Sequence, residues 1–427
     1  MSIFYHESTQ TFHLTNGEIS YLMKVLPNGA LGQLYCGQAV RDRESFDHLL
    51  ELRSRPMSSC VFEGNRYFSL EHCKQEYPAY GSTDFRHPAV ELCQPNGSRI
   101  TDFVYHSHTV MPGKPALPGL PATYCEADGE AETLTVCLRD PLLEVELYLN
   151  YTIFAGQPAL ARSACLKNRG GQDLHLTAAM SLSLDLPDSG YEFVHFSGAW
   201  SRERFMKVRQ LEQGIQSVES TRGHSSHNHN PFIMLRRPGT DEDKGEVMGF
   251  SLVYSGNFLA QVEVDNWDTA RVTMGINPFG FDWKLSPGGE FQTPEAVMVY
   301  SSQGMGAMSR AFHKLYRTRL ARGYWRDRPR PVLLNNWEAT YFDFTEDKLV
   351  SIAEAARKDG VELFVLDDGW FGARTHESAG LGDWAANPDR LPGGITRLAE
   401  RVERLGLRFG LWFEPEMANK DSDLYRA

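Results

Sequence analysis

Two adjacent carboxylates, Asp367 and Asp368, directly follow a short apolar run at 363–366. Neither can be buried unless hydrogen-bond partners satisfy it, so the fold must supply polar groups around the pair. Side by side, they could hydrogen-bond the vicinal hydroxyls of a sugar or ligate a metal. The alternative is that one caps the next helix while the other stays solvated. Their position at the end of an apolar run favours the functional interpretation.

Aromatic and acidic residues end two similar runs elsewhere in the chain. Trp337 and Trp412 could each pack an indole on the apolar face of a hexose ring, although a single tryptophan is more often part of a core. Glu414 and Glu416 could do acid–base work on a glycosidic bond, bind a metal, or support the rim of a domain. The sequence leaves the roles of the two glutamates open.

Two other features have ordinary structural explanations. His224, His227 and His229 lie within six residues, but no fourth ligand follows at a regular spacing and the run lies in a polar turn. We therefore predict a hydrogen-bonded turn here and no metal site. Trp200 lies in a region of expected strands, where core packing is the simplest explanation.

The elements that must position the strand-end residues follow a βαβαβ order. Apolar residues recur at three- and four-residue spacing over 345–358 and 394–405, which predicts two helices between three buried strands. Thr345 is the expected N-cap, and Gly360 and Gly406 are the expected stops. Polar residues at the carboxyl ends of successive parallel strands are typical of the active face of a (β/α)₈ barrel. A doubly wound sheet is disfavoured because no glycine-rich phosphate loop follows any of the strands.

Three regions divide the chain. Residues 1–303 read as β-structure throughout, with strictly alternating runs at 143–153 and 174–186 and frequent turn signals, so we predict a large antiparallel sandwich domain. The period becomes helical in the linker 304–330. Residues 331–427 then carry three of the eight strands that a barrel needs, and we expect an incomplete barrel with an exposed strand edge.

Composition excludes several classes of protein. The 427 residues carry a formal net charge of −12, which disfavours nucleic acid as a partner. No signal-peptide pattern opens the chain, and no apolar run approaches the length of a membrane span, so no membrane partner is expected. The seven cysteines are odd in number and form no Cys-x-x-Cys pair, which predicts a reduced, cytoplasmic protein with buried thiols.

With these residues in view, the chain resembles the bacterial α-galactosidases of glycoside hydrolase family 36 along its whole length. Many segments in the same order make this a specific signal. In the barrel region they are NWEATYFDF at 336–344, LDDGWFG at 366–372, LGDW at 381–384 and GLWFEPEM at 410–417. In the sandwich region they are EYPAYG at 76–81, SGAWSRER at 197–204 and SSHNHNPF at 225–232.

The resemblance implies a β-supersandwich followed by a (β/α)₈ barrel. The implied activity is hydrolysis, with retention, of terminal α-1,6-linked galactose from melibiose, raffinose and stachyose. Asp367 and Asp368 would bind O4 and O6 of galactose, and Trp337 and Trp412 would line the same subsite. Trp200 would reach in from a sandwich loop, across a subunit contact in a homotetramer. No metal or organic cofactor is implied.

The catalytic residues of the family do not map onto this chain. The family nucleophile is an Asp at the end of the fourth barrel strand, and the acid/base is an Asp after the sixth, so both are expected beyond Ala427. We therefore expect a substrate-binding half that hydrolyses nothing at a useful rate. One departure concerns Arg374-Thr-His-Glu, where the family often carries an acidic run after the Arg.

Three other functions compete with this interpretation. α-N-Acetylgalactosaminidase activity and galactosyl transfer of the raffinose-synthase kind occur on the same fold. The third is a non-catalytic sugar-binding protein built from a sandwich and half a barrel.

Overall fold

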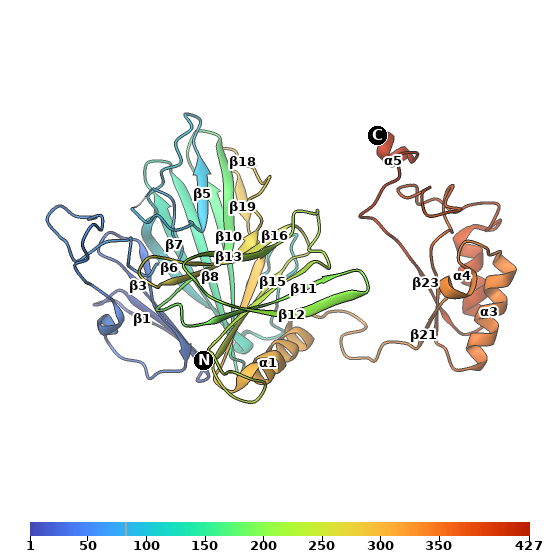
Figure 1. Cartoon of the computed structure of the whole chain (residues 1–427), viewed down its shortest axis with the longest axis horizontal. Coiled ribbons are helices and arrows are strands. Elements are labelled where there is room, and N and C mark those ends of the chain that lie inside the picture. Colours follow the sequence, from blue (N-terminus) through green and yellow to red (C-terminus); the bar gives the residue numbers. More distant parts are fainter. Residues whose placement is uncertain (82) are drawn as a thin grey trace. The chain divides into compact units, whose positions relative to one another are not determined.

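The computed structural model describes residues 1–81 and 83–427, which form two compact units, Met1–Ala321 and Arg322–Ala427 (Figure 1). The first unit is almost entirely β-structure, and the second combines a small parallel sheet with helices. The predicted order, mainly β-structure with few helices, is correct at this level. The finer division at 303 and 330 stays a prediction.

Two of the antiparallel sheets in the first unit have four and six strands. The four-stranded sheet consists of β1 (Ser2–His6), β2 (Thr11–Thr15), β3 (Ile19–Val25) and β4 (Leu31–Gln38). The six-stranded sheet consists of β5 (Val90–Cys93), β10 (Leu174–Leu186), β13 (Gly214–Glu219), β16 (Phe258–Val264), β17 (Ala270–Ile276) and β18 (Trp283–Leu285).

A ten-stranded sheet joins distant parts of the chain, in the order β12-β11-β14-β15-β20-β9-β8-β7-β6 with β19 beside β9. Its first five strands in the chain are β6 (Val104–Pro112), β7 (Ala131–Asp140), β8 (Val145–Phe154), β9 (Ala159–Asn168) and β11 (Glu192–Ala199). The others are β12 (Arg202–Gln210), β14 (His229–Arg236), β15 (Val247–Val253), β19 (Glu290–Gln292) and β20 (Glu295–Ser301). The short 3₁₀ helices η1 (Asp47–Leu49) and η2 (Asp128–Glu130) lie between strands.

Alternation of apolar and polar residues explains why these strands share one core. In β8, Leu147, Leu149 and Tyr151 are buried, whereas Tyr148 and Asn150 between them are partly exposed. Successive side chains of a strand point to opposite faces, so the apolar set of each strand faces inward together. Buried residues from all three sheets form a single cluster, which accounts for the compactness of the first unit.

Helix α1 (Gly304–Arg319) lies within the first compact unit. The predicted helical period is present, and Met308, Phe312 and Leu315 form its buried apolar face. The helix packs on β15 and β20, and a side chain at Gly249 would meet Met308 Sδ and the Phe312 ring, each at 2.6 Å. Glycine at this strand position therefore allows the helix to approach the sheet closely.

The second unit is a three-stranded parallel sheet, β21-β22-β23, with its helices. The strands are β21 (Leu333–Asn335), β22 (Leu363–Leu366) and β23 (Arg408–Leu411). The helices are α2 (Trp337–Thr340), α3 (Glu346–Lys358), α4 (Gly394–Arg404) and α5 (Asp423–Arg426). The prediction of strands buried on both faces holds best for β22. β21 and β23 are more exposed because they form the two edges of this sheet among the described residues.

The predicted ends of the two long helices are confirmed. Thr345 accepts a hydrogen bond from the Lys348 backbone N–H at 3.3 Å, as an N-cap does. Gly360 and Gly406 have φ of +88° and +81°, the left-handed conformation in which a glycine ends a helix. Buried Leu349 and Leu398 are among the residues through which α3 and α4 contribute to the core of this unit.

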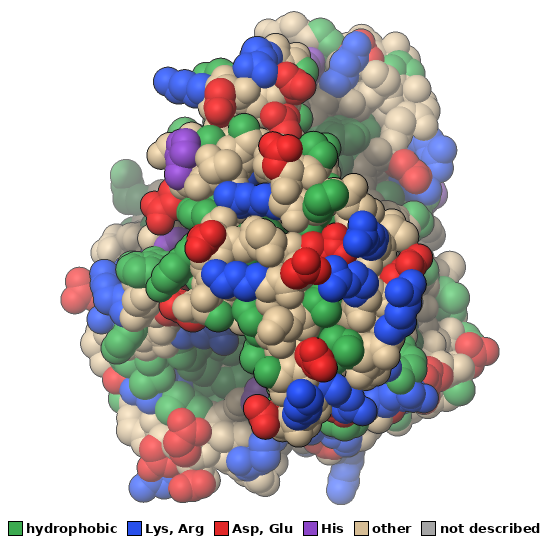
Figure 2. All heavy atoms as spheres, turned by 90° about the vertical axis from the view of Figure 1, so that its right-hand side faces the viewer, with side chains coloured by type: hydrophobic (Ala, Val, Ile, Leu, Met, Phe, Trp, Pro, Cys, Tyr) green, Lys and Arg blue, Asp and Glu red, His purple; other side chains and the backbone are tan. Residues whose placement is uncertain are grey.

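The surface charges and the burial of the cysteines can be compared with the sequence predictions. On the face drawn in Figure 2, Lys and Arg side chains alternate with Asp and Glu side chains. All seven cysteines are free thiols, but the expectation of buried thiols fails at Cys60, which is exposed. Among the described residues, no helix has both the length and the apolar character needed to cross a bilayer.

Candidate functional site

The carboxyl ends of the three parallel strands meet at one edge of the sheet in the second unit. Backbone and side-chain hydrogen bonds link them, since the Asp367 N–H donates to Asn336 Oδ1 at 2.8 Å and the Trp412 N–H donates to the Leu366 carbonyl at 2.9 Å. Trp337 begins α2 directly after β21. The structure therefore brings four of the five predicted site residues, Asp367, Asp368, Trp337 and Trp412, to the same edge.

Asp368 is held by an arginine. The residue is 5% exposed, and the Arg374 guanidinium donates to both carboxylate oxygens, with Nη2 to Oδ2 at 2.7 Å and Nε to Oδ1 at 2.9 Å. Arg374 is itself buried and also donates to the carbonyls of Glu377 and Ala379. These charge-assisted bonds fix the orientation of the carboxylate. Asp368 is therefore neither a helix cap nor solvated, which removes one alternative.

Asp367 is more exposed to solvent than Asp368. One of its oxygens accepts from the Asp368 backbone N–H at 2.7 Å, and the other accepts from Asn335 Nδ2. A carboxylate has about four lone-pair sites, so capacity remains for the hydroxyl of a ligand. Asp367 is partly exposed, which leaves those sites accessible.

Three polar residues that support the pair escaped sequence reasoning. Asn335 contacts Asp367, and the fully buried Asn336 joins Asp367 to Thr340 through the two ends of its carboxamide. Arg374 holds Asp368 from a loop six residues downstream. The two asparagines could have been found, because polar residues directly after an apolar strand are the same signal that identified the aspartates.

Aromatic rings surround the strand ends. Trp337 and Trp412 are half-buried, so each keeps an accessible surface. Trp370 differs, because it is 3% exposed and its Nε1 donates to the Trp412 carbonyl at 3.0 Å. The Phe413 ring lies 5.3 Å from Trp370, centroid to centroid. Trp370 is thus a core residue that supports the segment carrying Trp412.

Glu414 and Glu416, whose roles the sequence left open, lie in different environments. Glu414 is partly buried and Glu416 is exposed. Burial raises the pKa of Glu414, and the nearby carboxylates of Glu416 and Asp368 raise it further, against the opposing effect of Arg374. Glu414 therefore lies within electrostatic range of Asp368.

Trp200 lies in the first unit, in the turn between β11 and β12. Its side chain is 85% exposed, so the core-packing explanation is wrong. Every residue of β12 beside it is also exposed, which leaves the indole at the tip of a projecting hairpin. Alternation in the sequence could not show this, because it does not reveal whether a second layer covers a strand.

The histidine-rich segment forms hydrogen bonds within its turn and with β11. His224 Nδ1 accepts from the Ser226 backbone N–H at 3.1 Å, and His229 Nδ1 lies 3.2 Å from Ser197 Oγ. Across the described residues, 1–81 and 83–427, no group of three or more His, Cys, Asp or Glu side chains is arranged to hold a metal ion.

His195 lies on β11, beside the histidine-rich segment. Its burial should make the stability of the folded chain depend on pH. His195 is 1% exposed, and burial, with the nearby Arg209 and His229, lowers its pKa to about 4. The unfolded chain protonates this histidine near its ordinary pKa of about 6.5, so the folded state loses stability as pH falls from about 6.5 toward 4. We expect His195→Gln to remove up to about 2 kcal/mol of that loss.

The measurement is the urea midpoint at pH 7.5 and pH 4.5. The drop between the two pH values should shrink in His195→Gln and persist in His175→Gln, which changes an exposed histidine paired with Asp282. An equal drop in both variants would contradict the assignment of the effect to His195.

Comparison with known proteins matches two successive parts of the chain. The sequence profile of the glycosyl hydrolase family 36 N-terminal domain matches residues 29–286, and the melibiase profile matches residues 290–427. The chain is 53% identical over 426 residues to α-galactosidase AgaA of Geobacillus stearothermophilus, covering 100% of this chain and 58% of that protein.

Solved structures of family 36 α-galactosidases superpose closely on this chain. The crystal structure of the family 36 α-galactosidase AgaB from Geobacillus stearothermophilus has a TM-score of 0.94 and 52% identity, covering 100% of this chain and 58% of that one. A variant of Geobacillus AgaA in complex with raffinose has a TM-score of 0.93 and 52% identity, covering 97% of this chain and 58% of that one. The chain thus spans somewhat over half the length of these relatives.

Proposed function

The chain belongs to glycosyl hydrolase family 36, and from this premise we propose that it is the substrate-binding part of an α-galactosidase acting on raffinose-type oligosaccharides. The reaction is hydrolysis of a terminal α-1,6-linked galactose with retention. The observation that carries the proposal is the Asp367–Asp368 pair at the end of a parallel strand, with one carboxylate fixed and the other open. A relative of 52% identity has been crystallised with raffinose, which supports this class of substrate.

Each site residue has a role in this proposal. Asp368 and Asp367 accept hydrogen bonds from the O4 and O6 hydroxyls of galactose, and the Arg374 contact keeps Asp368 in the required orientation. Trp337 and Trp412 offer half-buried indole surfaces to the apolar face of the ring. The exposed Trp200 contributes from a projecting hairpin, in a homotetramer.

Fold and location follow from the same premise. We propose that the sheets of the first unit form a β-supersandwich covering 1–303, that 304–330 is a helical linker whose helix α1 packs on that domain, and that 331–427 are the first βα units of a (β/α)₈ barrel. We further propose a cytoplasmic location. No metal or organic cofactor takes part in the proposed reaction.

Cleavage requires carboxyl groups that we do not assign within residues 1–427. A retaining glycosidase uses one carboxylate as nucleophile and a second group as acid and base. Asp368 already accepts hydrogen bonds from Arg374 through both oxygens, and Asp367 accepts from Asn335, so both are suited to binding. The proposal places the nucleophile and the acid/base outside these residues.

Raffinose binding tests the binding role. Calorimetric titration of the 427-residue chain should show raffinose binding that weakens about 10- to 100-fold in Asp368→Asn and in Asp367→Asn, since each loses a hydrogen bond to a charged acceptor. Asp359→Asn, at the exposed end of α3, is the matched control and should bind as the unchanged chain does. Asp367 is partly exposed, so its variant remains informative if Asp368→Asn folds poorly. Unchanged raffinose affinity in both variants would contradict the assignment.

A further inference from the structure

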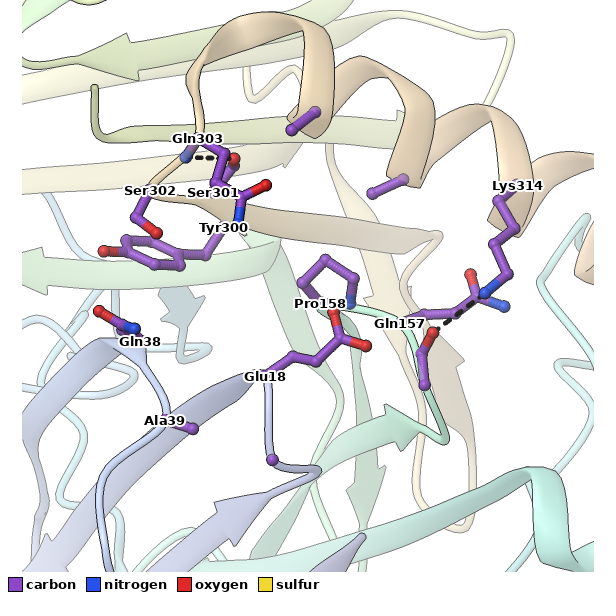
Figure 3. Close-up of a pocket in the computed structure, with 14 residues that line it drawn as sticks. Glu18, Gln38, Ala39, Gln157, Pro158, Tyr300, Ser301, Ser302, Gln303 and Lys314 are labelled. Carbon is purple, nitrogen blue, oxygen red and sulfur yellow. Dashed lines mark hydrogen bonds between the residues drawn. The ribbon is translucent and has the colours of Figure 1, made fainter. Parts of the chain in front are cut away.

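A polar cavity of about 470 Å³ lies within the first unit, apart from every residue assigned above. Five segments line it: the β2–β3 turn, the end of β4, the β8–β9 turn, the end of β20, and α1. Figure 3 shows Gln38 and Tyr300 toward one end of the cavity, and Gln157 and Lys314 toward the other. Its volume is in the range of small-molecule sites.

Hydrogen bonds between the walls hold the cavity in shape. Asn16 Nδ2, in the β2–β3 turn, donates to the carbonyls of Phe154 and Gln157 at 2.8 and 2.6 Å. Lys314 Nζ, on α1, donates to the Gly156 carbonyl at 3.1 Å. Three lining segments are thus fixed to one another without a ligand. A preformed site loses little free energy to ordering when it binds.

One buried group in this cavity lacks a partner. Gln157 is 5% exposed, and its Oε1 is buried with no hydrogen bond to any residue that the structure describes. Such an atom costs about 1–3 kcal/mol unless something satisfies it. Gln157 also lines the cavity, so a ligand bound there would lie beside this carboxamide.

The other polar groups are mostly neutral and unengaged. The side chains of Gln38, Ser302 and Gln303 form no hydrogen bond with the described residues, so each is available to a ligand. The charged groups are one of each sign, Glu18 and Lys314, so the lining has no net charge. Carboxamides and hydroxyls both donate and accept, as do the hydroxyls of a sugar.

A small apolar patch completes the lining. Pro158, Ala307 and Ala311 present short side chains, and the two alanines lie one turn apart on the same face of α1. We propose that this cavity is a second binding site, for a neutral mono- or disaccharide whose hydroxyls meet the amides and whose apolar face meets the alanines. An amino acid fits less well, because the single cation, Lys314, is exposed and already donates to a carbonyl.

Saccharide binding is measured in an Asp368→Asn background, so that the galactose site proposed above does not contribute. Sucrose, titrated by calorimetry and checked by saturation-transfer NMR, should bind with a Kd of about 1 mM. Gln157→Leu removes a lining carboxamide, and Ala311→Leu fills the cavity from a partly exposed position on α1. Each should weaken binding at least tenfold. The controls Gln172→Leu and His313→Leu, at exposed positions outside the cavity, should stay within twofold.

Three results would overturn the second site. They are no sucrose binding in the Asp368→Asn background, binding unchanged by both Gln157→Leu and Ala311→Leu, and binding of glycine in place of sucrose. Raffinose binding that responds to Asp368→Asn but not to the cavity variants would keep the proposed function and reject only this site. Ala311→Leu keeps the test decisive if Gln157→Leu does not fold.

Discussion

Replacing Arg162 with methionine will lower the free energy of unfolding by about 3–5 kcal/mol, because it leaves a buried carboxylate without its cation. Arg162 and Glu76 are 3% and 0% exposed, and Arg162 Nη2 lies 2.5 Å from Glu76 Oε1. Tyr21 and Tyr151 each donate a hydroxyl hydrogen bond to the same carboxylate, at 2.7 and 2.9 Å. The cluster connects β3, β8 and β9. Its loss should therefore weaken the packing of two sheets of the first unit.

The measurement is the urea midpoint at pH 7.5. Burial raises the pKa of Glu76 to about 7 although Arg162 lowers it, so removal of Arg162 forces this carboxyl to take up a proton on folding. The double variant Arg162→Met, Glu76→Gln should recover part of the loss. Arg169→Met, which breaks an exposed ion pair with Glu146, should cost about 0–1 kcal/mol. Equal losses of unfolding free energy in Arg162→Met and Arg169→Met would show that the buried cluster stabilises the fold no more than an exposed ion pair does.

Local sequence patterns correctly predicted the helices, whose hydrogen bonds and caps join residues a few positions apart. The apolar spacing of α3 and α4, the cap at Thr345 and the stops at Gly360 and Gly406 all reappear in the structure. Sheet order could not be predicted in the same way. β10 pairs with β5, β17 and β18, which are separated from it by long stretches of chain, and alternation does not specify a partner.

The site was predictable to the extent that it lies at strand ends. Asp367, Asp368, Trp337 and Trp412 could be grouped because the carboxyl ends of parallel strands share an edge. Arg374 could not, because it lies in a loop whose path no periodicity specifies. The roles assigned to these residues come from the family resemblance and remain proposals.

Under the proposed function, we expect that continuing this chain with the sequence that its relatives carry beyond the matched region will turn a galactoside-binding protein into a working glycosidase. The physical reason is the chemistry of retention, in which one carboxylate attacks C1 and a second group about 5–5.5 Å away protonates the leaving oxygen. Without a nucleophile, binding of a galactoside stabilises no covalent intermediate, so tight binding alone gives no turnover. We therefore expect the 427-residue chain to bind its substrate without cleaving it.

The most direct test is release of nitrophenol from p-nitrophenyl α-galactoside. Two proteins are compared: the 427-residue chain, and the same chain continued by the part of Geobacillus stearothermophilus AgaA that follows its matched region. We predict release only by the continued chain, and strong loss of that activity on Asp368→Asn. Release by the 427-residue chain alone, abolished by Asp368→Asn, would show that the catalytic carboxylates already lie within residues 1–427 and would contradict the proposed division between binding and cleavage.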